Sequence, residues 1–125
     1  MNLDKVIAGF FIILAMTVNF GFFYGELDSL AHHSKYELFA AIIVNLIATV
    51  LKLGDKTQMG SVLIASSLVA DIQLITAATL WTIYGVNGTI SPEIFGVIIS
   101  LSGGALLANI TSVILYIGDT LKSKR

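Results

Sequence analysis

Residues 59 to 84 read MGSVLIASSLVADIQLITAATLWTIY, a run of 26 residues in which Asp71 is the only charged side chain. A helix of this length rises about 39 Å, enough to cross the roughly 30 Å hydrocarbon core of a bilayer. Asp71 then lies roughly 18–20 Å from either end of the run, near the bilayer midplane. Because an ionised carboxylate is costly at that depth, we expect Asp71 to be neutral, paired or turned towards a watery cavity, and we treat it as a functional candidate.

The composition of the whole chain indicates an integral membrane protein. Of its 125 residues, 56% are hydrophobic and 12% are charged, and the mean hydropathy is +0.90. The apolar runs lie at residues 6–24, 38–53, 59–84 and 94–117. We therefore predict an all-α, polytopic protein with four transmembrane helices, forming a single transmembrane domain over residues 1–125 whose first partner is the lipid bilayer.

Basic residues are distributed unevenly around these runs, and the distribution predicts the orientation. Six of the seven flank the same ends of the four runs: Lys5, Lys52, Lys56, Lys122, Lys124 and Arg125. Short loops rich in lysine and arginine stay on the cytoplasmic side of a membrane. We expect both termini and the connection between the second and third helices to be cytoplasmic.

The two halves of the chain resemble each other. Residues 45–55 (NLIATVLKLGD) align without a gap to residues 109–119 (NITSVILYIGD). The pattern favours a tandem duplicated helical hairpin, with repeats at about 1–57 and 58–125, although chance similarity between apolar segments is the alternative. Residues 100–107 then form an insertion of about two turns, so the fourth helix should be longer than the second.

Small residues recur at every fourth position of the fourth run: Gly96, Ser100, Gly104, Ala108 and Ser112. We call this set the small-residue ribbon. Such ribbons let helix backbones approach closely, which is a usual association signal in lipid. The second helix of the same chain and the fourth helix of another subunit are both open as partners. We expect a homo-oligomer or a subunit of a larger membrane complex.

Polar side chains inside the runs are the candidates for an ion pathway: Asn19, Asn45, Ser67, Asp71, Gln73 and Asn109. In one interpretation Asp71 binds a cation or proton, and neighbouring amide and hydroxyl oxygens help to replace water. In the other, Asp71 only fastens the third helix to an asparagine of the second or fourth.

A cluster of potential metal ligands lies between the first and second runs. Glu26, His32 and His33 stand close together in the sequence, with Asp28 and Glu37 nearby. These residue types can bind zinc or another divalent ion. Their spacing is not diagnostic, and a solvated loop that needs polar residues is the alternative interpretation.

Enzymatic functions lack support in the sequence. It has no cysteine and no HExxH, GxSxG, Walker or GxGxxG motif, so we expect neither catalysis nor a cofactor. The net charge of −1 gives no indication of nucleic-acid binding.

The segments YELFAAIIVNLIATVLKLGD (36–55) and SSLVADIQLI (66–75) resemble a family of small four-helix bacterial inner-membrane proteins of unknown function. This resemblance implies a location in the bacterial inner membrane and brings no activity or ligand with it. From the residues themselves we expect a subunit of a cation or proton channel or transporter that acts as an oligomer. The alternative is a non-conducting accessory or assembly subunit of a larger membrane complex.

Overall fold

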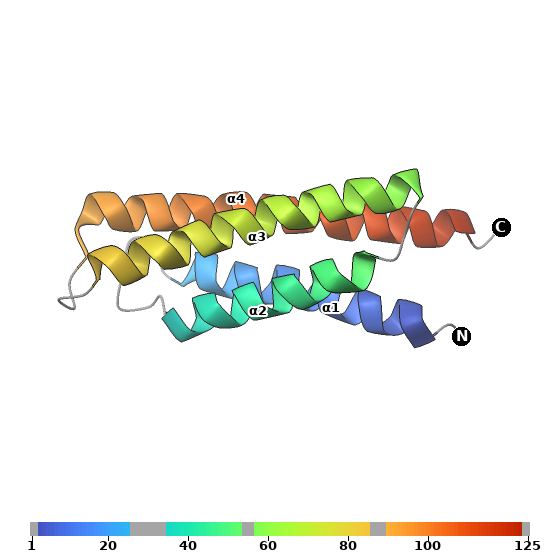
Figure 1. Ribbon diagram of the computed structural model, residues 1–125, viewed down its shortest axis with the longest axis horizontal. Helices are drawn as coiled ribbons and strands as arrows, with labels where there is room; N and C mark the ends of the chain where they lie inside the picture. The colour runs from blue at the N-terminus through green and yellow to red at the C-terminus, as the bar shows by residue number, and fades with distance from the viewer. Residues whose placement is uncertain (1–2, 26–34, 54–56, 86–89, 124–125) are drawn as a thin grey trace.

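The computed structural model describes residues 3–25, 35–53, 57–85 and 90–123, which form a bundle of four α-helices (Figure 1). Each helix covers one of the four apolar runs, so the prediction of an all-α, four-helix protein is confirmed. The helices are α1 (Leu3–Tyr24), α2 (Lys35–Lys52), α3 (Gln58–Tyr84) and α4 (Pro92–Ser123).

Successive helices run in opposite directions, so both ends of the chain lie at the same end of the bundle (Figure 1). We call this the termini end, and we call the opposite end, where α1 leads towards α2 and α3 towards α4, the loop end. Each helix packs against its neighbours in the chain, and α1 also packs against α4, which closes the ring. The most extensive contact joins α3 and α4, the two longest helices.

Side-chain caps and helix breakers fix the ends of α3 and α4. The Thr57 hydroxyl accepts a hydrogen bond from the Gly60 amide at 3.0 Å, as expected for an N-cap threonine. The Ser91 hydroxyl accepts one from the Ile94 amide at 3.2 Å, and Pro92 takes the first helical position, where a missing amide proton has no effect on helix bonding. The long third and fourth helices therefore begin at defined positions.

The interior of the bundle contains mainly small and polar residues, and its outer surface is apolar. The buried faces carry alanine, serine, asparagine and threonine next to a few larger apolar side chains. Large aliphatic residues cover the outer faces, including Leu107 at 67% exposure and Ile72 at 63%. An exposed apolar surface of this extent is unfavourable in water but suits lipid, where small interior residues allow close helix packing.

Three helices are long and apolar enough to cross a membrane: Leu3–Tyr24, Gln58–Tyr84 and Pro92–Lys122. The fourth predicted span corresponds to α2, which has 18 residues and carries Lys35, Glu37 and Lys52. With these three charged residues, α2 is less apolar than the three helices that meet the description of a membrane span. The structure thus supports a multi-pass membrane protein with three candidate spans.

The predicted difference in length between the second and fourth helices is confirmed, since α2 has 18 residues and α4 has 32. Asn45 and Asn109, which match in the two halves of the sequence, are both buried. The duplication itself stays a prediction.

Candidate functional site

Asp71 lies in the middle of α3 and points into the bundle, with only 4% of its surface exposed. Buried residues recur at three- and four-residue intervals along α3, so Ser67, Asp71 and Leu74 belong to the same inward face. The Asp71 Oδ2 atom accepts a hydrogen bond of 2.6 Å from the Thr49 hydroxyl of α2. The other carboxylate oxygen, Oδ1, is buried and has no hydrogen-bond partner among the described residues. Such an unsatisfied atom calls for an explanation, and water or an ion is one of the usual ones.

Lys52, the last residue of α2, is the second charged group inside the bundle. Only 5% of its surface is exposed. Its ammonium group donates a hydrogen bond to the Ser67 hydroxyl, one turn before Asp71 on α3, and it attracts the Asp71 carboxylate electrostatically. A buried lysine is rarely found without such partners. Lys52, Ser67 and Asp71 therefore form one polar cluster between α2 and α3.

Thr49 connects this cluster to the backbone of α2. Its hydroxyl oxygen lies 2.6 Å from Asp71 Oδ2 and 2.9 Å from the carbonyl oxygen of Asn45. A hydroxyl has one proton and two lone pairs, so it donates to one of these two oxygens at a time. The Asn45 side chain itself donates to the Ala41 carbonyl oxygen at 2.7 Å, within its own helix. Asn45 thus joins the cluster through its backbone, and its amide group bonds elsewhere.

A cavity of about 280 Å³ leads from the termini end of the bundle to Lys52. Residues from all four helices line it: Asp4, Lys5, Ala8, Ile12, Leu51, Lys52, Leu63, Tyr116 and Asp119. The Tyr116 hydroxyl donates to the Lys5 carbonyl oxygen at 2.5 Å. Gly9 allows the approach of that ring, because a Cβ atom there would lie 3.2 Å from Tyr116 Cε2. Lys52 therefore stands between a cavity that carries charges of both signs and the carboxylate of Asp71.

Towards the loop end, the buried faces of α2 and α3 become apolar. The buried core there includes Leu38 and Ala41 from α2 and Leu74, Ala77 and Ala78 from α3. On both helices, the buried polar residues precede this core when the bundle is followed from the termini end. Within one chain, the polar cluster faces the cavity at the termini end and is separated from the loop end by apolar packing.

The remaining predicted pathway residues are Asn19, Gln73 and Asn109, which belong to α1, α3 and α4 respectively. Asn19 of α1 is fully buried, and neither atom of its amide group has a hydrogen-bond partner in the described part of the chain. Asn109 of α4 is also buried, and its Nδ2 atom is unpartnered within the same residues. Gln73 points at α4, where its Nε2 atom would lie 2.6 Å from a Cβ atom built on Gly104. The structure thus brings Ser67 and Asp71 together with α2, whereas Gln73 belongs to the contact between α3 and α4.

The small-residue ribbon divides into two parts. Towards the termini end it packs within the chain: Gly104 contacts Gln73, and the hydroxyls of Ser112 and Ser66 are 2.6 Å apart. The partner there is α3. Gly96 and Ser100, nearer the loop end, are exposed, and a Cβ atom on Gly96 would meet nothing within 4 Å.

The last member of the small-residue ribbon and the metal candidates complete the account of the predicted residues. Ala108 is partly buried and packs against the core. Glu26, His32 and His33 lie outside the described residues, so the predicted metal site stays untested. Among residues 3–25, 35–53, 57–85 and 90–123, no group of three histidine, cysteine or acidic side chains is placed to hold a metal.

Sequence reasoning missed two members of the cluster, Lys52 and Thr49. By its position in the sequence, Lys52 indicates only the cytoplasmic end of the second run. A signal was nevertheless present, because positions 45, 49 and 52 follow the spacing of four and three that keeps residues on one helix face. The face that holds a buried asparagine therefore also holds the lysine.

Residues 32–120 match a protein family described as a family of unknown function (DUF6394). The match covers most of the chain, including all of α2 and α3 and nearly all of α4, and the chain therefore belongs to this family. A search of the curated proteins and a search of the solved structures found nothing that matches the chain.

Proposed function

We propose that the chain is an integral membrane subunit that moves protons across the membrane, and that Asp71 takes up and releases them. The observation that supports this proposal most is the position of the Thr49 hydroxyl between Asp71 Oδ2 and the Asn45 carbonyl oxygen, at 2.6 and 2.9 Å. This arrangement suits a carboxyl group that changes its protonation state inside a membrane.

Both states of Asp71 find hydrogen bonds without a movement of the helices. When Asp71 is ionised, the Thr49 hydroxyl donates its proton to Oδ2. When Asp71 is protonated on Oδ2, the new O–H group donates to the Thr49 oxygen, and Thr49 donates to the Asn45 carbonyl instead. Only the Thr49 proton reorients, and neither state leaves the Thr49 hydroxyl or Asp71 Oδ2 unpaired.

The Lys52 ammonium favours a proton over a metal cation as the transported species. A cation bound at Asp71 would stand close to a second positive charge, which repels it. A proton added to Asp71 instead weakens the attraction between Asp71 and Lys52. Lys52 lines the same cavity as Asp4 and Asp119, so the released ammonium group stays beside a cavity that carries two carboxylates. We therefore propose that protons are exchanged through the cavity at the termini end.

The complete transporter is proposed to contain four spanning helices per chain and more than one chain. In a bilayer, α2 would place Lys35 and Glu37 at one interface and keep Lys52 paired inside the bundle. The described parts of α2 and α3 pack through apolar side chains towards the loop end, so we propose that a partner subunit or a rearrangement supplies the polar route to that side. The basic flanks support a cytoplasmic position of both termini, and the family resemblance implies the bacterial inner membrane.

A second candidate is a non-conducting accessory subunit of a larger membrane complex. The specific observation in its favour is that the same contacts, Thr49 to Asp71 and Lys52 to Ser67, fasten α2 to α3. Such bonds hold helices together in lipid without any transport.

Proton uptake into liposomes separates the two candidates. The purified protein is reconstituted alone, a potassium gradient with valinomycin sets the membrane potential, and a trapped dye reports the internal pH. We expect proton flux for the wild type, loss of that flux for Asp71→Asn, and a marked reduction for Thr49→Val, which keeps the side-chain shape. Thr76→Val is the matched control, because Thr76 is exposed on α3 and bonds only its own helix at 2.7 Å.

Mass photometry of each variant checks that assembly is intact. Flux that is absent for the wild type under every proton, sodium and potassium gradient would overturn the proposal and favour the accessory function. Flux that survives Asp71→Asn would retain transport but reject Asp71 as its site.

A further inference from the structure

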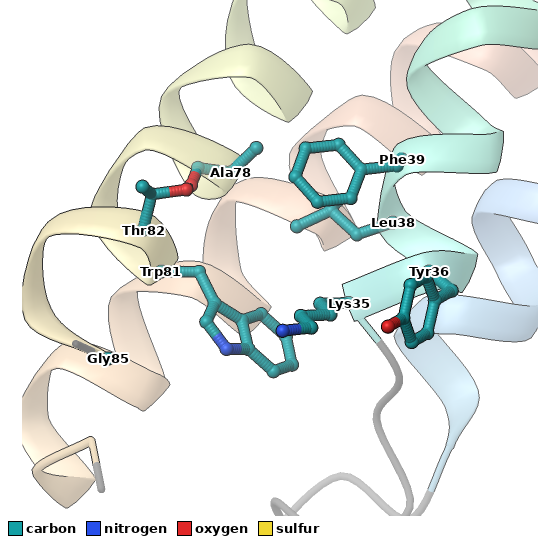
Figure 2. Close-up of a pocket in the computed structure, with 8 residues that line it drawn as sticks. All are labelled: Lys35, Tyr36, Leu38, Phe39, Ala78, Trp81, Thr82 and Gly85. Carbon is teal, nitrogen blue, oxygen red and sulfur yellow. The ribbon is translucent and has the colours of Figure 1, made fainter. Parts of the chain in front are cut away.

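A second cavity opens at the loop end, between α2 and α3, and none of the residues discussed for proton transfer line it (Figure 2). Its volume is about 500 Å³. The lining residues are Lys35, Tyr36, Leu38, Phe39, Ala78, Trp81, Thr82 and Gly85. Polar and aromatic groups stand at the two helix ends, and apolar side chains stand deeper between the helices.

The mouth of this cavity is cationic and aromatic. Figure 2 shows the Lys35 side chain extending from α2 in the direction of Trp81 on α3. The Lys35 ammonium also lies 5.6 Å from the centre of the Tyr36 ring. The nearby carboxylate of Glu37 is directed elsewhere, since its Oε2 atom lies 3.0 Å from a Cβ atom built on Gly21 of α1. A positive group with tryptophan and tyrosine beside it, at the end of a helix, is typical of the headgroup level of a membrane.

An apolar groove joins the deeper part of this cavity and runs along the outside of α2 and α3. It has a volume of about 360 Å³ and shares Phe39, Ala78 and Thr82 with the cavity. Its further lining residues are Ile42, Ile75, Thr79 and Ile83. The two threonines do not make it polar, because their hydroxyls donate to carbonyl oxygens of their own helix at 2.8 and 2.9 Å.

We propose that this continuous groove binds an anionic phospholipid, with the phosphate at Lys35 and Trp81 and one acyl chain between Ile42, Ile75 and Ile83. The charge of Lys35 complements a phosphate, and the indole N–H of Trp81 can donate to one of its oxygens. The apolar part of the groove faces away from the bundle, where lipid chains are available. A soluble phosphate would use only the mouth, whereas a phospholipid uses both parts of the groove.

Native mass spectrometry of the detergent-solubilised full chain tests the proposal. The probes are dioleoyl phosphatidylglycerol and dioleoyl phosphatidylcholine, which have the same chains and different headgroup charge. We expect phosphatidylglycerol to bind in preference, and Lys35→Gln to weaken its binding about fivefold, as for one basic group near an anionic headgroup. Lys122→Gln, a matched change of an exposed lysine at the termini end, should leave binding unchanged.

A second variant and a soluble competitor test the apolar part of the groove. Ala78→Leu fills the position shared by the cavity and the groove, and it should reduce phosphatidylglycerol binding while the far-ultraviolet circular dichroism spectrum reports an intact helical fold. Glycerol phosphate should not compete with the lipid. Equal binding of the two lipids together with no effect of Lys35→Gln would overturn the proposal. Full competition by glycerol phosphate would overturn it as well, since the groove would then recognise only a phosphate.

Discussion

Replacing Lys52 by methionine tests whether the buried charges of α2 and α3 depend on each other. Methionine keeps the length and apolar stem of lysine but removes the ammonium group. The Asp71 carboxylate then loses its nearby positive charge, and Ser67 loses its hydrogen-bond donor. Removing one partner of a buried charged pair typically destabilises a protein by about 3–5 kcal/mol. Because Lys52 lines a cavity that can admit water, we expect a value at the lower end, about 3 kcal/mol.

The assay is unfolding by sodium dodecyl sulfate in mixed micelles, followed by the fluorescence of Trp81. This is the sole tryptophan of the chain, and its ring packs 6.0 Å from that of Phe22, so it reports contact between α1 and α3. The double variant Lys52→Met/Asp71→Asn removes both charges and should recover about 2 kcal/mol of the loss, within the range of measured couplings between contacting residues. Lys122→Met, at an exposed position, should stay within about 0.5 kcal/mol of the wild type.

The destabilisation by Lys52→Met should also shrink as the pH falls, because protonation removes the unpaired charge of Asp71. A free energy of unfolding for Lys52→Met within about 0.5 kcal/mol of the wild type would refute the reasoning. Strict additivity of the Lys52→Met and Asp71→Asn effects would refute it too, because independent sites add and interacting sites do not.

Two further predictions concern packing and orientation. Gly104→Leu should destabilise the fold by about 2 kcal/mol, because its Cβ atom alone would displace the Gln73 amide group and the further leucine carbons overpack the contact between α3 and α4. Gly96→Leu should leave the unfolding midpoint unchanged, because nothing lies within 4 Å of a Cβ atom there. If Gly104→Leu and Gly96→Leu unfold at the same sodium dodecyl sulfate concentration, this account of the small-residue ribbon is contradicted. Reporter fusions after Lys122 should show a cytoplasmic C-terminus, and periplasmic alkaline phosphatase activity from that fusion would reverse the proposed topology.

The number and position of the helices could be predicted because they depend on local sequence. Four apolar runs separated by polar segments already define four helices, and the exposed aliphatic surface agrees with their assignment to lipid. The length of α4 followed from comparing the two asparagine-containing segments. Whether α2 spans is less easily predicted, because its 18 residues include Lys35, Glu37 and Lys52.

The composition of the site could be predicted only in part. Asp71 was identifiable because a charge in a long apolar run stands out, but its partners depend on how α2 and α3 face each other. Lys52 resembles an ordinary flanking lysine in the sequence, and its burial follows from the contact with Ser67. The small-residue ribbon identified one face of α4 as a packing face. Its partner could not be predicted, because the orientation of α3 about its own axis decides that Gln73 lies against Gly104.

The central claim is that Asp71 changes its protonation state while bonded to Thr49, and infrared difference spectroscopy measures this directly. Spectra of the reconstituted protein are recorded as the pH is stepped from alkaline to acidic, for the wild type, Asp71→Asn and Thr49→Val. The account predicts a carboxyl C=O band in the wild type that Asp71→Asn abolishes and that Thr49→Val shifts to higher frequency, because the protonated carboxyl group then loses its hydrogen-bond partner. Identical difference spectra for the wild type and Asp71→Asn would contradict it.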